Sequence, residues 1–437
     1  MRRGGALILS VLMLLSLAAC SRTPQPSQQD QEERYLVRQE VQTVYGVESP
    51  AVEDEQVFQM AAATDPAAQQ VSASSSQEMR AVWFSYLTLE PMIKGRTQAQ
   101  FSQSMAVAFQ NVAQLGCDTV FVQVRPFGDA FYHSQYFPWS SYLTGEEGKN
   151  PGYDPLEILC SLADEYGLRI EAWLNPYRVR AAYATTPMSA QNPAQKWLDA
   201  GTGDVLTWNQ GVYYNPASAS AQELIVNGVR EIVQNYDVDG IHFDDYFYPT
   251  TDPSFDAVSY QASGTNLSQA DWRRENVNQL VRRVYAAIKE LDPDCVFGIS
   301  PQGNNRINYE EQYADTALWL SNPGYVDYIC PQIYYGYQNS TCPYAETVAE
   351  WDEMIQTEGI RLYVGLAAYK LGQEDTWAGE GKREWIGTTN LLARMVQTAR
   401  SAQHYGGVAL YPYESLFPVQ PTQQLEQELQ NLEIAFH

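Results

Sequence analysis

The sequence predicts an α/β fold in which eight strand-helix units close into a (β/α)8 barrel, the TIM barrel, preceded by a signal peptide and a flexible tether. Three observations support this. Strand-like apolar runs alternate with amphipathic helical segments from residue 79 onward, as in parallel sheets. Eight such units fit a closed barrel better than an open sheet. Polar residues recur where the expected strands end, which is where such barrels keep their sites.

The expected strands are short runs rich in β-branched and aromatic residues. They cover residues 79–87, 118–126, 168–176, 238–246, 295–302, 325–335, 362–369 and 407–413. The expected helices show apolar residues at 3.6-residue spacing, most clearly over 272–291. The others are expected at 97–115, 155–166, 219–235, 311–321, 344–358, 388–404 and 421–433. Long loops at 126–154 and 176–218 follow the second and third strands, so we expect them on the C-terminal face of the barrel.

The N-terminus predicts export and anchoring. In residues 1–20, Arg2 and Arg3 precede an apolar stretch that is typical of a signal peptide and too short to span a membrane. Its end, Leu17-Ala-Ala-Cys20, resembles a bacterial lipoprotein box, which predicts lipidation of Cys20; the alternative is an ordinary signal peptide with an incidental cysteine. Residues 21–77 are rich in Gln, Ser, Glu, Pro and Ala and predict a tether, with a short helix near 35–45, and the barrel occupies 78–437. The expected location is the cell envelope, on the extracytoplasmic side of a membrane.

Composition excludes several functions. The chain has 27 basic and 52 acidic residues, a net charge of −25, which disfavours nucleic acid as a partner. Its four histidines show no H-x-x-H spacing and its cysteines no zinc spacing, so no metal is expected. There is no G-x-S-x-G elbow and no glycine-rich loop after the first strand, so neither a serine hydrolase nor a cofactor is predicted.

Candidate site residues lie at the C-terminal ends of the expected strands. Alternate residues of a barrel strand point inward, and the last ones line the mouth. The polar and aromatic candidates are Arg125, Asp129, Glu171, Trp173, Asn175, His242, Asp244, Tyr246, Asn304, Gln332, Tyr334, Tyr411 and Glu414. Their recurrence around the ring indicates a ligand site. The alternative is a plug of side chains that satisfy one another, and it applies most to Glu171, which lies deeper.

Carboxylates beside aromatic rings favour sugar chemistry. Glycoside cleavage needs two carboxyl groups, and a carboxyl that must hold a proton at neutral pH can gain its raised pKa from a neighbouring carboxylate. Asp244 and Asp245 are adjacent in the segment GIHFDDYFYP. Strand alternation would send them to opposite faces, so a bend at the strand end is needed to bring both into the pocket.

Long motifs occur in order over residues 79–417, among them FVQVRPFGDAFYHSQYFPWSSYLTG, IEAWLNPYRV, VDGIHFDDYFYP and VDYICPQIYYGY. Together they resemble the glycosyl-hydrolase-like family 10 barrels, bacterial envelope proteins that include divisome-localised hydrolases of peptidoglycan strands stripped of peptides. The resemblance implies a lipid-anchored glycosidase that acts on glycan polymer, with cell-division or cell-wall machinery as partner. It also implies that Asp244 is catalytic. Residues shaping the pocket would be Arg125, Asp129, Trp173, Asn175 and Arg178, with Gln332 and Tyr334 opposite.

The segment DGIHFDDY is also similar to the D-G-x-D-x-D-x-E strand of chitinase-type barrels. Asp239 and Asp244 match, but His242 replaces the middle aspartate and Tyr246 stands where the acid glutamate would be. The proton donor is therefore open among Asp245, Glu171, Asp129 and Glu414. Two further functions stay open: hydrolysis of another amino-sugar exopolysaccharide, and glycan binding without catalysis.

Overall fold

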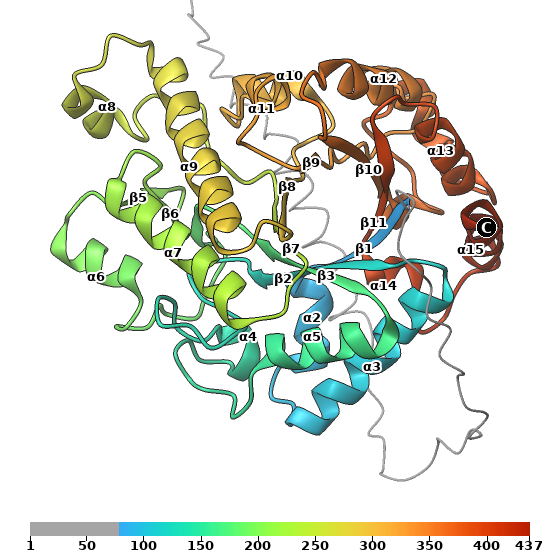
Figure 1. The fold of residues 1–437 in the computed structure, drawn as a ribbon, viewed down its shortest axis with the longest axis horizontal. Coiled ribbons are helices and arrows are strands. Elements are labelled where there is room, and N and C mark those ends of the chain that lie inside the picture. Colours follow the sequence, from blue (N-terminus) through green and yellow to red (C-terminus); the bar gives the residue numbers. More distant parts are fainter. Residues whose placement is uncertain (1–77) are drawn as a thin grey trace, which may run out of the picture. The chain divides into compact units, whose positions relative to one another are not determined.

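The computed structural model describes residues 78–437, drawn in colour in Figure 1. The predicted signal peptide with Cys20, the tether and the short helix near 35–45 lie outside the described residues. None of the helices in the described part combines the length and apolar character needed to cross a membrane.

Eight parallel strands close into the predicted barrel, in the order β1-β11-β10-β9-β8-β7-β3-β2. They are β1 (Met79–Phe84), β2 (Thr119–Arg125), β3 (Arg169–Leu174), β7 (Gly240–Phe243), β8 (Val296–Ile299), β9 (Tyr328–Ile329), β10 (Arg361–Ala367) and β11 (Tyr405–Tyr411). Each lies within or overlaps a predicted strand, so the (β/α)8 prediction is confirmed. Figure 1 looks down the ring of strands, with the helices outside it.

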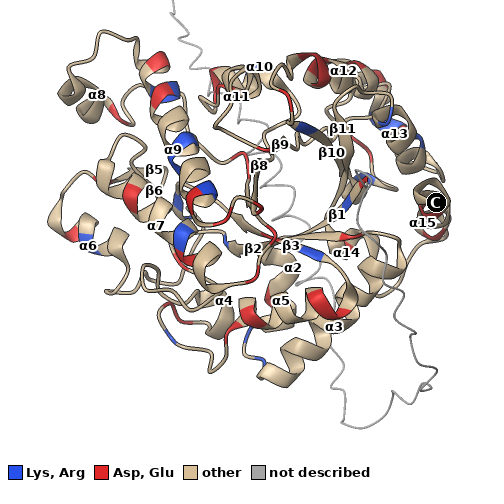
Figure 2. Ribbon diagram, in the orientation of Figure 1, with Lys and Arg blue, Asp and Glu red and all other residues tan. Residues whose placement is uncertain are grey.

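The surrounding helices also match the sequence pattern, except for a helix at residues 305–310 that was not predicted. They include α3 (Gln98–Gln114), α5 (Pro155–Tyr166), α7 (Ala219–Asn235), α9 (Gln269–Leu291), α10 (Asn305–Glu310), α11 (Thr316–Ser321), α12 (Tyr344–Met354), α13 (Leu391–Ala399) and α15 (Gln423–Phe436). Local signals fix their ends: Thr97 and Gln100 form a capping box for α3, and Gly167 ends α5 at a φ of 64°. The apolar stripes pack on the strands, while charged residues lie mainly on the outer helices and loops (Figure 2).

All eight barrel strands end earlier than predicted, and three of these ends lie next to residues of the predicted site. The first gives way after Phe84 because Ser85 caps a short helix, α2 (Tyr86–Ile93). The sixth, predicted over 325–335, is only β9, since Pro331 has no amide N–H to continue the ladder. Beyond it, Gln332 makes isolated bridges to Gln302 and Gly365. The fourth, β7, stops at Phe243, before the two aspartates.

The two long loops contain structure that the sequence analysis did not predict. Loop 126–154 holds the short helix α4 (Ser141–Thr144). Loop 176–218 holds an antiparallel sheet in the order β4-β6-β5 and a helix: β4 (Arg178–Arg180), β5 (Val205–Trp208), β6 (Gly211–Tyr214) and α6 (Pro193–Ala200). The β5–β6 turn is made by Asn209 and Gln210, both at positive φ, without the glycine that usually marks such a turn. Other short elements are α8 (Ala257–Ser263), α14 (Tyr413–Leu416), η1 (Ala368–Lys370) and η2 (Gly379–Arg383).

The five cysteines of the described part are all free, and all but Cys342 are buried. Four of them thus behave as small apolar residues of the core. Within residues 78–437, no group of three or more His, Cys, Asp or Glu side chains is arranged to hold a metal ion.

Candidate active site

Two carboxylates lie side by side in the chain just beyond the end of β7. The last ladder contact there is the bond from Ser300 N to Phe243 O, and the chain bends at Asp245. The alternation of a strand, which would point Asp244 and Asp245 to opposite faces, therefore no longer applies to them. Both side chains are buried, at 2% and 5% exposure. Burial of two adjacent carboxylates needs partners or a function, because an isolated buried charge is costly.

Side chains from the end of β3 hold Asp244. Its Oδ2 accepts a hydrogen bond from Trp173 Nε1 at 3.0 Å and another from Asn175 Nδ2 at 3.4 Å. Its Oδ1 accepts from the backbone N–H of Tyr246 at 3.3 Å. The structure thus brings together Trp173, Asn175 and Asp244, three residues that the sequence placed at the barrel mouth.

The strand ends on the other side of β7 hold Asp245. Gln332 Nε2 donates to Asp245 Oδ1 at 3.2 Å and to the carbonyl oxygen of Ser300 at 3.0 Å. Gln332 follows β9 and Ser300 follows β8, so four neighbouring strands meet at the carboxylate pair. The bend that both carboxylates needed to face one site is present.

Burial changes the acidity of both groups. It raises the pKa of Asp244 to about 7, and the charge of Asp245 raises it as well, whereas Arg178 acts in the opposite direction. Burial also raises the pKa of Asp245 to about 6, against hydrogen bonds and the charge of Arg178. At neutral pH the pair can therefore hold a proton that ordinary aspartates would have lost.

Arg178 links this pair to the neighbouring loop. Its guanidinium lies over two rings, 4.3 Å from the ring centre of Tyr246 and 4.6 Å from that of Phe127. Its backbone N–H donates to Asn175 Oδ1 at 2.8 Å, which also orients the amide that binds Asp244. Stacked between two aromatic faces, the guanidinium is held in place beside the carboxylates.

Aromatic rings form another part of the barrel mouth. Tyr334 and Tyr411 stack with ring centres 5.8 Å apart and planes 16° apart. Tyr369 stands edge-on to both, and Trp83 lies edge-on to Tyr411. Sequence reasoning found Tyr334 and Tyr411 but not Tyr369. The signal was present, because Tyr369 ends the seventh predicted strand.

A chain of hydrogen bonds closes the barrel beneath the carboxylates. Trp83 Nε1 donates to His242 Nε2 at 3.2 Å, so the proton of the neutral imidazole lies on Nδ1, which is 2.7 Å from Tyr328 Oη. The Tyr328 hydroxyl in turn donates to Glu171 Oε2. Burial lowers the pKa of His242 to about 3 and raises that of Glu171 to about 8. We call these four side chains, Trp83, His242, Tyr328 and Glu171, the floor network.

The floor network corresponds to the plug considered as the alternative for Glu171. Glu171 pairs in register with Gly240, at the start of β7, whereas Asp244 follows its end. Gly298 leaves room for the Tyr328 ring, since a Cβ there would lie 1.9 Å from Tyr328 Cζ. Both nitrogens of His242 are occupied within the protein. The proposed roles of Glu171 in catalysis and of His242 in substrate binding stay predictions, but the geometry gives each a packing role.

The remaining predicted residues lie around this centre. Asn304 caps α10 by accepting from Arg306 N at 3.2 Å. Glu414 accepts a hydrogen bond from the Thr88 hydroxyl. Arg125 is fully buried, with its guanidinium 4.8 Å from the Phe137 ring centre, and its Nε and Nη2 have no hydrogen-bond partner within residues 78–437. Their predicted contacts with substrate are not tested by this arrangement.

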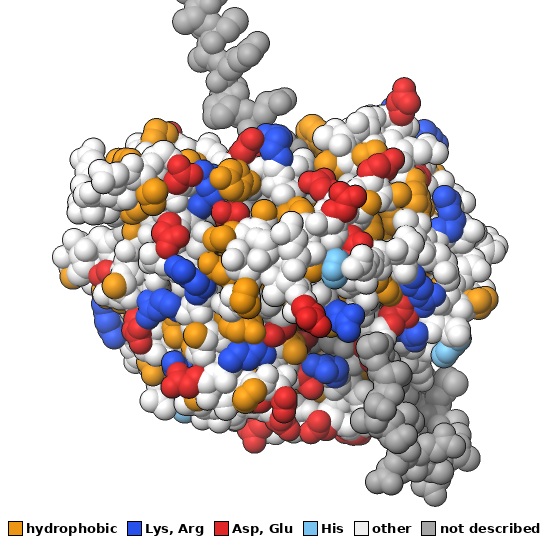
Figure 3. Space-filling view, turned by 45° about the horizontal axis from the view of Figure 1, so that its top comes forward, with side chains coloured by type: hydrophobic (Ala, Val, Ile, Leu, Met, Phe, Trp, Pro, Cys, Tyr) orange, Lys and Arg blue, Asp and Glu red, His pale blue; other side chains and the backbone are white. Residues whose placement is uncertain are grey.

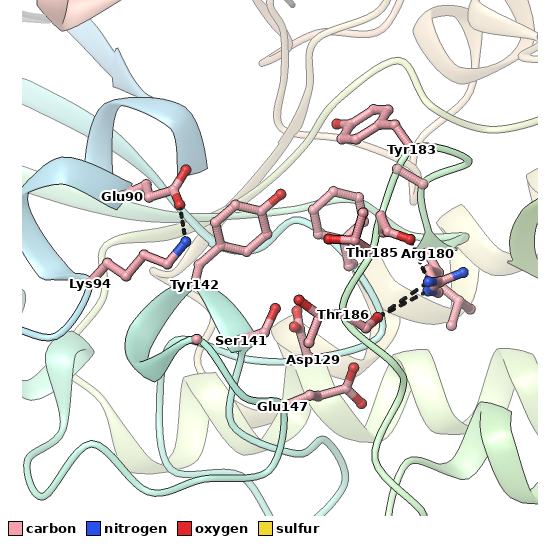
Figure 4. A pocket seen from close by; sticks show the side chains of 15 residues that line it. Glu90, Lys94, Asp129, Ser141, Tyr142, Glu147, Arg180, Tyr183, Thr185 and Thr186 are labelled. Atoms are coloured by element: carbon pink, nitrogen blue, oxygen red, sulfur yellow. Dashed lines mark hydrogen bonds and ion pairs between the residues drawn. The ribbon is translucent and has the colours of Figure 1, made fainter. Parts of the chain in front are cut away.

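Asp129 lies apart from the pair, in a pocket of about 240 Å³ between α2, the 126–154 loop and the segment that follows β4 (Figure 4). Neither Asp244 nor Asp245 lines this pocket. Burial raises the pKa of Asp129 to about 7, and the charge of Glu147 contributes. Sequence reasoning did not find the pocket, because its far wall comes from loop 176–218, within which no further structure was predicted.

Comparison with known proteins agrees with this geometry. Residues 78–379 match the family model described as glycosyl hydrolase-like 10. The chain is 35% identical over 357 residues to glycosyl hydrolase YngK of Bacillus subtilis (strain 168), covering 76% of this chain and 69% of that protein. It is 34% identical over 340 residues to glycosyl hydrolase DigH of Escherichia coli (strain K12), covering 68% of this chain and 75% of that protein.

Solved structures share the fold at low identity. The glycoside hydrolase domain of PgaB (BpsB) from Bordetella bronchiseptica superposes with a TM-score of 0.52 at 14% identity, covering 82% of this chain and 99% of that one. The catalytic domain of β-amylase from Paenibacillus polymyxa gives the same TM-score at 12% identity, covering 82% and 98%. The family resemblance read from the motifs is confirmed: the chain belongs to the glycosyl hydrolase-like 10 family.

Proposed function

We propose that this protein hydrolyses glycosidic bonds in bacterial cell-wall glycan, with Asp244 and Asp245 as its acid/base pair. The observation that carries the proposal is the position of two buried carboxylates with raised pKa values at the mouth of the barrel. Each is bound by side chains from neighbouring strand ends, so the pair is held rigidly.

The proposed hydrolysis depends on one proton that the carboxyl groups of Asp244 and Asp245 share. A glycosidic oxygen needs a proton as it leaves, and the oxocarbenium-like centre needs a carboxylate nearby. Between the pKa values of the pair, one carboxyl keeps its proton and the other is charged. Trp173, Asn175 and Gln332 donate hydrogen bonds to the pair and stabilise the charge. Tyr334, Tyr369 and Tyr411 offer ring faces and edges on which sugar rings can pack.

The substrate and location belong to the same proposal. We propose peptide-free peptidoglycan strands as substrate, because the motifs resemble those of envelope hydrolases with that specificity. Lipidation of Cys20 and the 21–77 tether would hold the barrel near the wall, within reach of the division machinery. Basic and acidic side chains are interspersed on the face of the molecule that Figure 3 shows.

The decisive experiment measures soluble fragments released from purified sacculi after amidase treatment, identified by mass spectrometry. Asp244→Asn and Asp245→Asn should each lower release by about 10²–10⁴-fold. Glu146→Gln, which removes the charge of an exposed carboxylate on a nearby loop, should leave it unchanged. If Asp244→Asn releases fragments at the wild-type rate, Asp244 is not catalytic.

Two substrates separate the competing functions. Fragment release from an amino-sugar exopolysaccharide, but not from sacculi, would replace the cell-wall assignment with the exopolysaccharide one. If the wild-type protein binds glycan strands yet never shortens them, the hydrolase proposal is wrong and the barrel is a glycan-binding protein.

A further inference from the structure

The pocket that contains Asp129 has an apolar wall and a polar base. Tyr142 forms the wall, with its ring stacked on Phe127 at 5.9 Å and edge-on to Tyr86 at 5.0 Å. Across the opening, the hydroxyl of Tyr183 is hydrogen-bonded to that of Tyr86 at 2.8 Å. In Figure 4, Asp129, Ser141 and Tyr142 lie on one side, and Tyr183, Thr185 and Thr186 on the other. At about 240 Å³, the space is slightly smaller than sites for drug-sized ligands and suits a single sugar ring.

One acceptor in this pocket has no partner. Asp129 is 4% exposed, and its carboxylate interacts with the Ser140 hydroxyl and the Ser141 N–H. Its Oδ1 nevertheless has no hydrogen-bond partner within the described part of the chain. Leaving a buried acceptor unpaired costs about 1–3 kcal/mol, more for a charged group. A ligand that donates a hydrogen bond would remove this cost.

The other charged groups of the pocket are already paired. Lys94 forms an ion pair with Glu90 at 2.6 Å. Arg180 donates to the carbonyl oxygens of Ala184 and Thr186. Glu147 accepts from Ser189 N and from Asn192 Nδ2. Among the buried side-chain atoms of the lining residues that the structure describes, Asp129 Oδ1 is the one without a partner, and it calls for a donor rather than an anion.

A row of stacked side chains connects the pocket to the carboxylate pair. Phe127 lines the pocket, and the guanidinium of Arg178 covers the Phe127 ring. The same guanidinium covers the ring of Tyr246, whose N–H is bound to Asp244. A glycan with one ring at the carboxylates could thus place a more distant ring in the pocket.

We propose that this pocket is a subsite for a neutral amino-sugar ring of the glycan, distant from the cleaved bond, which packs on Tyr142 and donates an O–H or amide N–H to Asp129. The proposal rests on the proposed function, because it extends the same substrate along the barrel mouth. It makes Asp129 a residue that selects substrate by length, rather than the second catalytic carboxylate.

The test measures binding without turnover. The full chain carrying Asp244→Asn is titrated by calorimetry with N-acetylglucosamine oligomers of increasing length. We expect affinity to rise at the length that reaches the pocket. Adding Asp129→Ala should remove that rise, weakening the longer oligomers by about tenfold, the equivalent of one hydrogen bond, while the affinity of shorter ones is unchanged. Adding Glu146→Gln should leave the rise intact.

A second variant keeps the test valid if Asp129→Ala does not fold. Thr185 is exposed and lines the pocket, so Thr185→Trp fills it without removing a buried group, and it should also abolish the rise. If the rise with length is absent, or persists in both variants, the subsite does not exist. If instead oligomers of deacetylated glucosamine bind better than acetylated ones, and Asp129→Ala removes that preference, the pocket takes a cationic ring and the neutral-ring assignment is wrong. The proposed function is tested separately: if it is wrong, the wild-type protein releases no fragments.

Discussion

Asp244→Asn should make the protein more stable at neutral pH while it lowers glycan cleavage by about 10²–10⁴-fold. Burial raises the pKa of Asp244 from 3.8 to about 7 in the folded state. Between these values the folded protein keeps a proton that the unfolded chain has released. The stability of the wild-type protein therefore falls as the pH rises through this window. Asparagine cannot ionise, so the variant should not show this decline.

The magnitude follows from the shift. A pKa difference of about three between the folded and unfolded states corresponds to at most about 4 kcal/mol of stability lost by the wild-type protein. The hydrogen bond from Trp173 survives, because the amide oxygen of asparagine can still accept it. The variant and the wild type should be similar in stability near pH 4, with the variant gaining until the pH passes about 7.

Urea unfolding followed by tryptophan fluorescence, from about pH 5 to about pH 8, measures the difference. Glu146→Gln provides the control for loss of one charge at an exposed site. A stability difference between Asp244→Asn and wild type that stays flat or falls with pH would refute the argument that burial keeps Asp244 protonated.

Three other changes test contacts elsewhere in the described chain. Glu171→Gln keeps an acceptor for Tyr328, so glycan cleavage should stay within a few-fold of wild type; a loss above about 100-fold, with circular dichroism unchanged, would make Glu171 catalytic. Gly298→Ala drives a methyl group into the Tyr328 ring and should destabilise the protein by about 3 kcal/mol in urea unfolding; an unchanged midpoint would show that the ring can move. Arg273→Leu leaves Asp256 buried without its ion-pair partner and should cost about 3–5 kcal/mol in the same assay, part of which Asp256→Leu should restore if the pair is the cause.

The sequence predicted the barrel well because its signals are local. Alternation and helical periodicity repeat eight times, and caps such as the Thr97 box mark the helix ends. It failed where an element is short or lacks the usual turn residues. The β4–β6 sheet is made of strands of three or four residues, and its Asn209-Gln210 turn carries no glycine.

The sequence predicted some of the side-chain contacts at the barrel mouth and missed others. Trp173, Asn175 and Gln332 do converge on the aspartates, because parallel strand ends meet at one edge. His242 and Glu171 lie within β7 and β3, and they are hydrogen-bonded to Trp83 and Tyr328, which lie far away in sequence. Only the pairing of β1, β3, β7 and β9 around the ring reveals those partners. The same holds for the Asp129 pocket, whose walls come from three separate segments.

The floor network also limits how a polymer can use this barrel. Phe121 stacks on His242 at 4.2 Å, and Tyr363 packs on Tyr328, so rings fill the interior from wall to wall. No strand of sugar can thread through the barrel. A glycan hydrolysed as proposed must therefore lie across the opening, and both halves of the cut chain must leave by the side on which the glycan arrived.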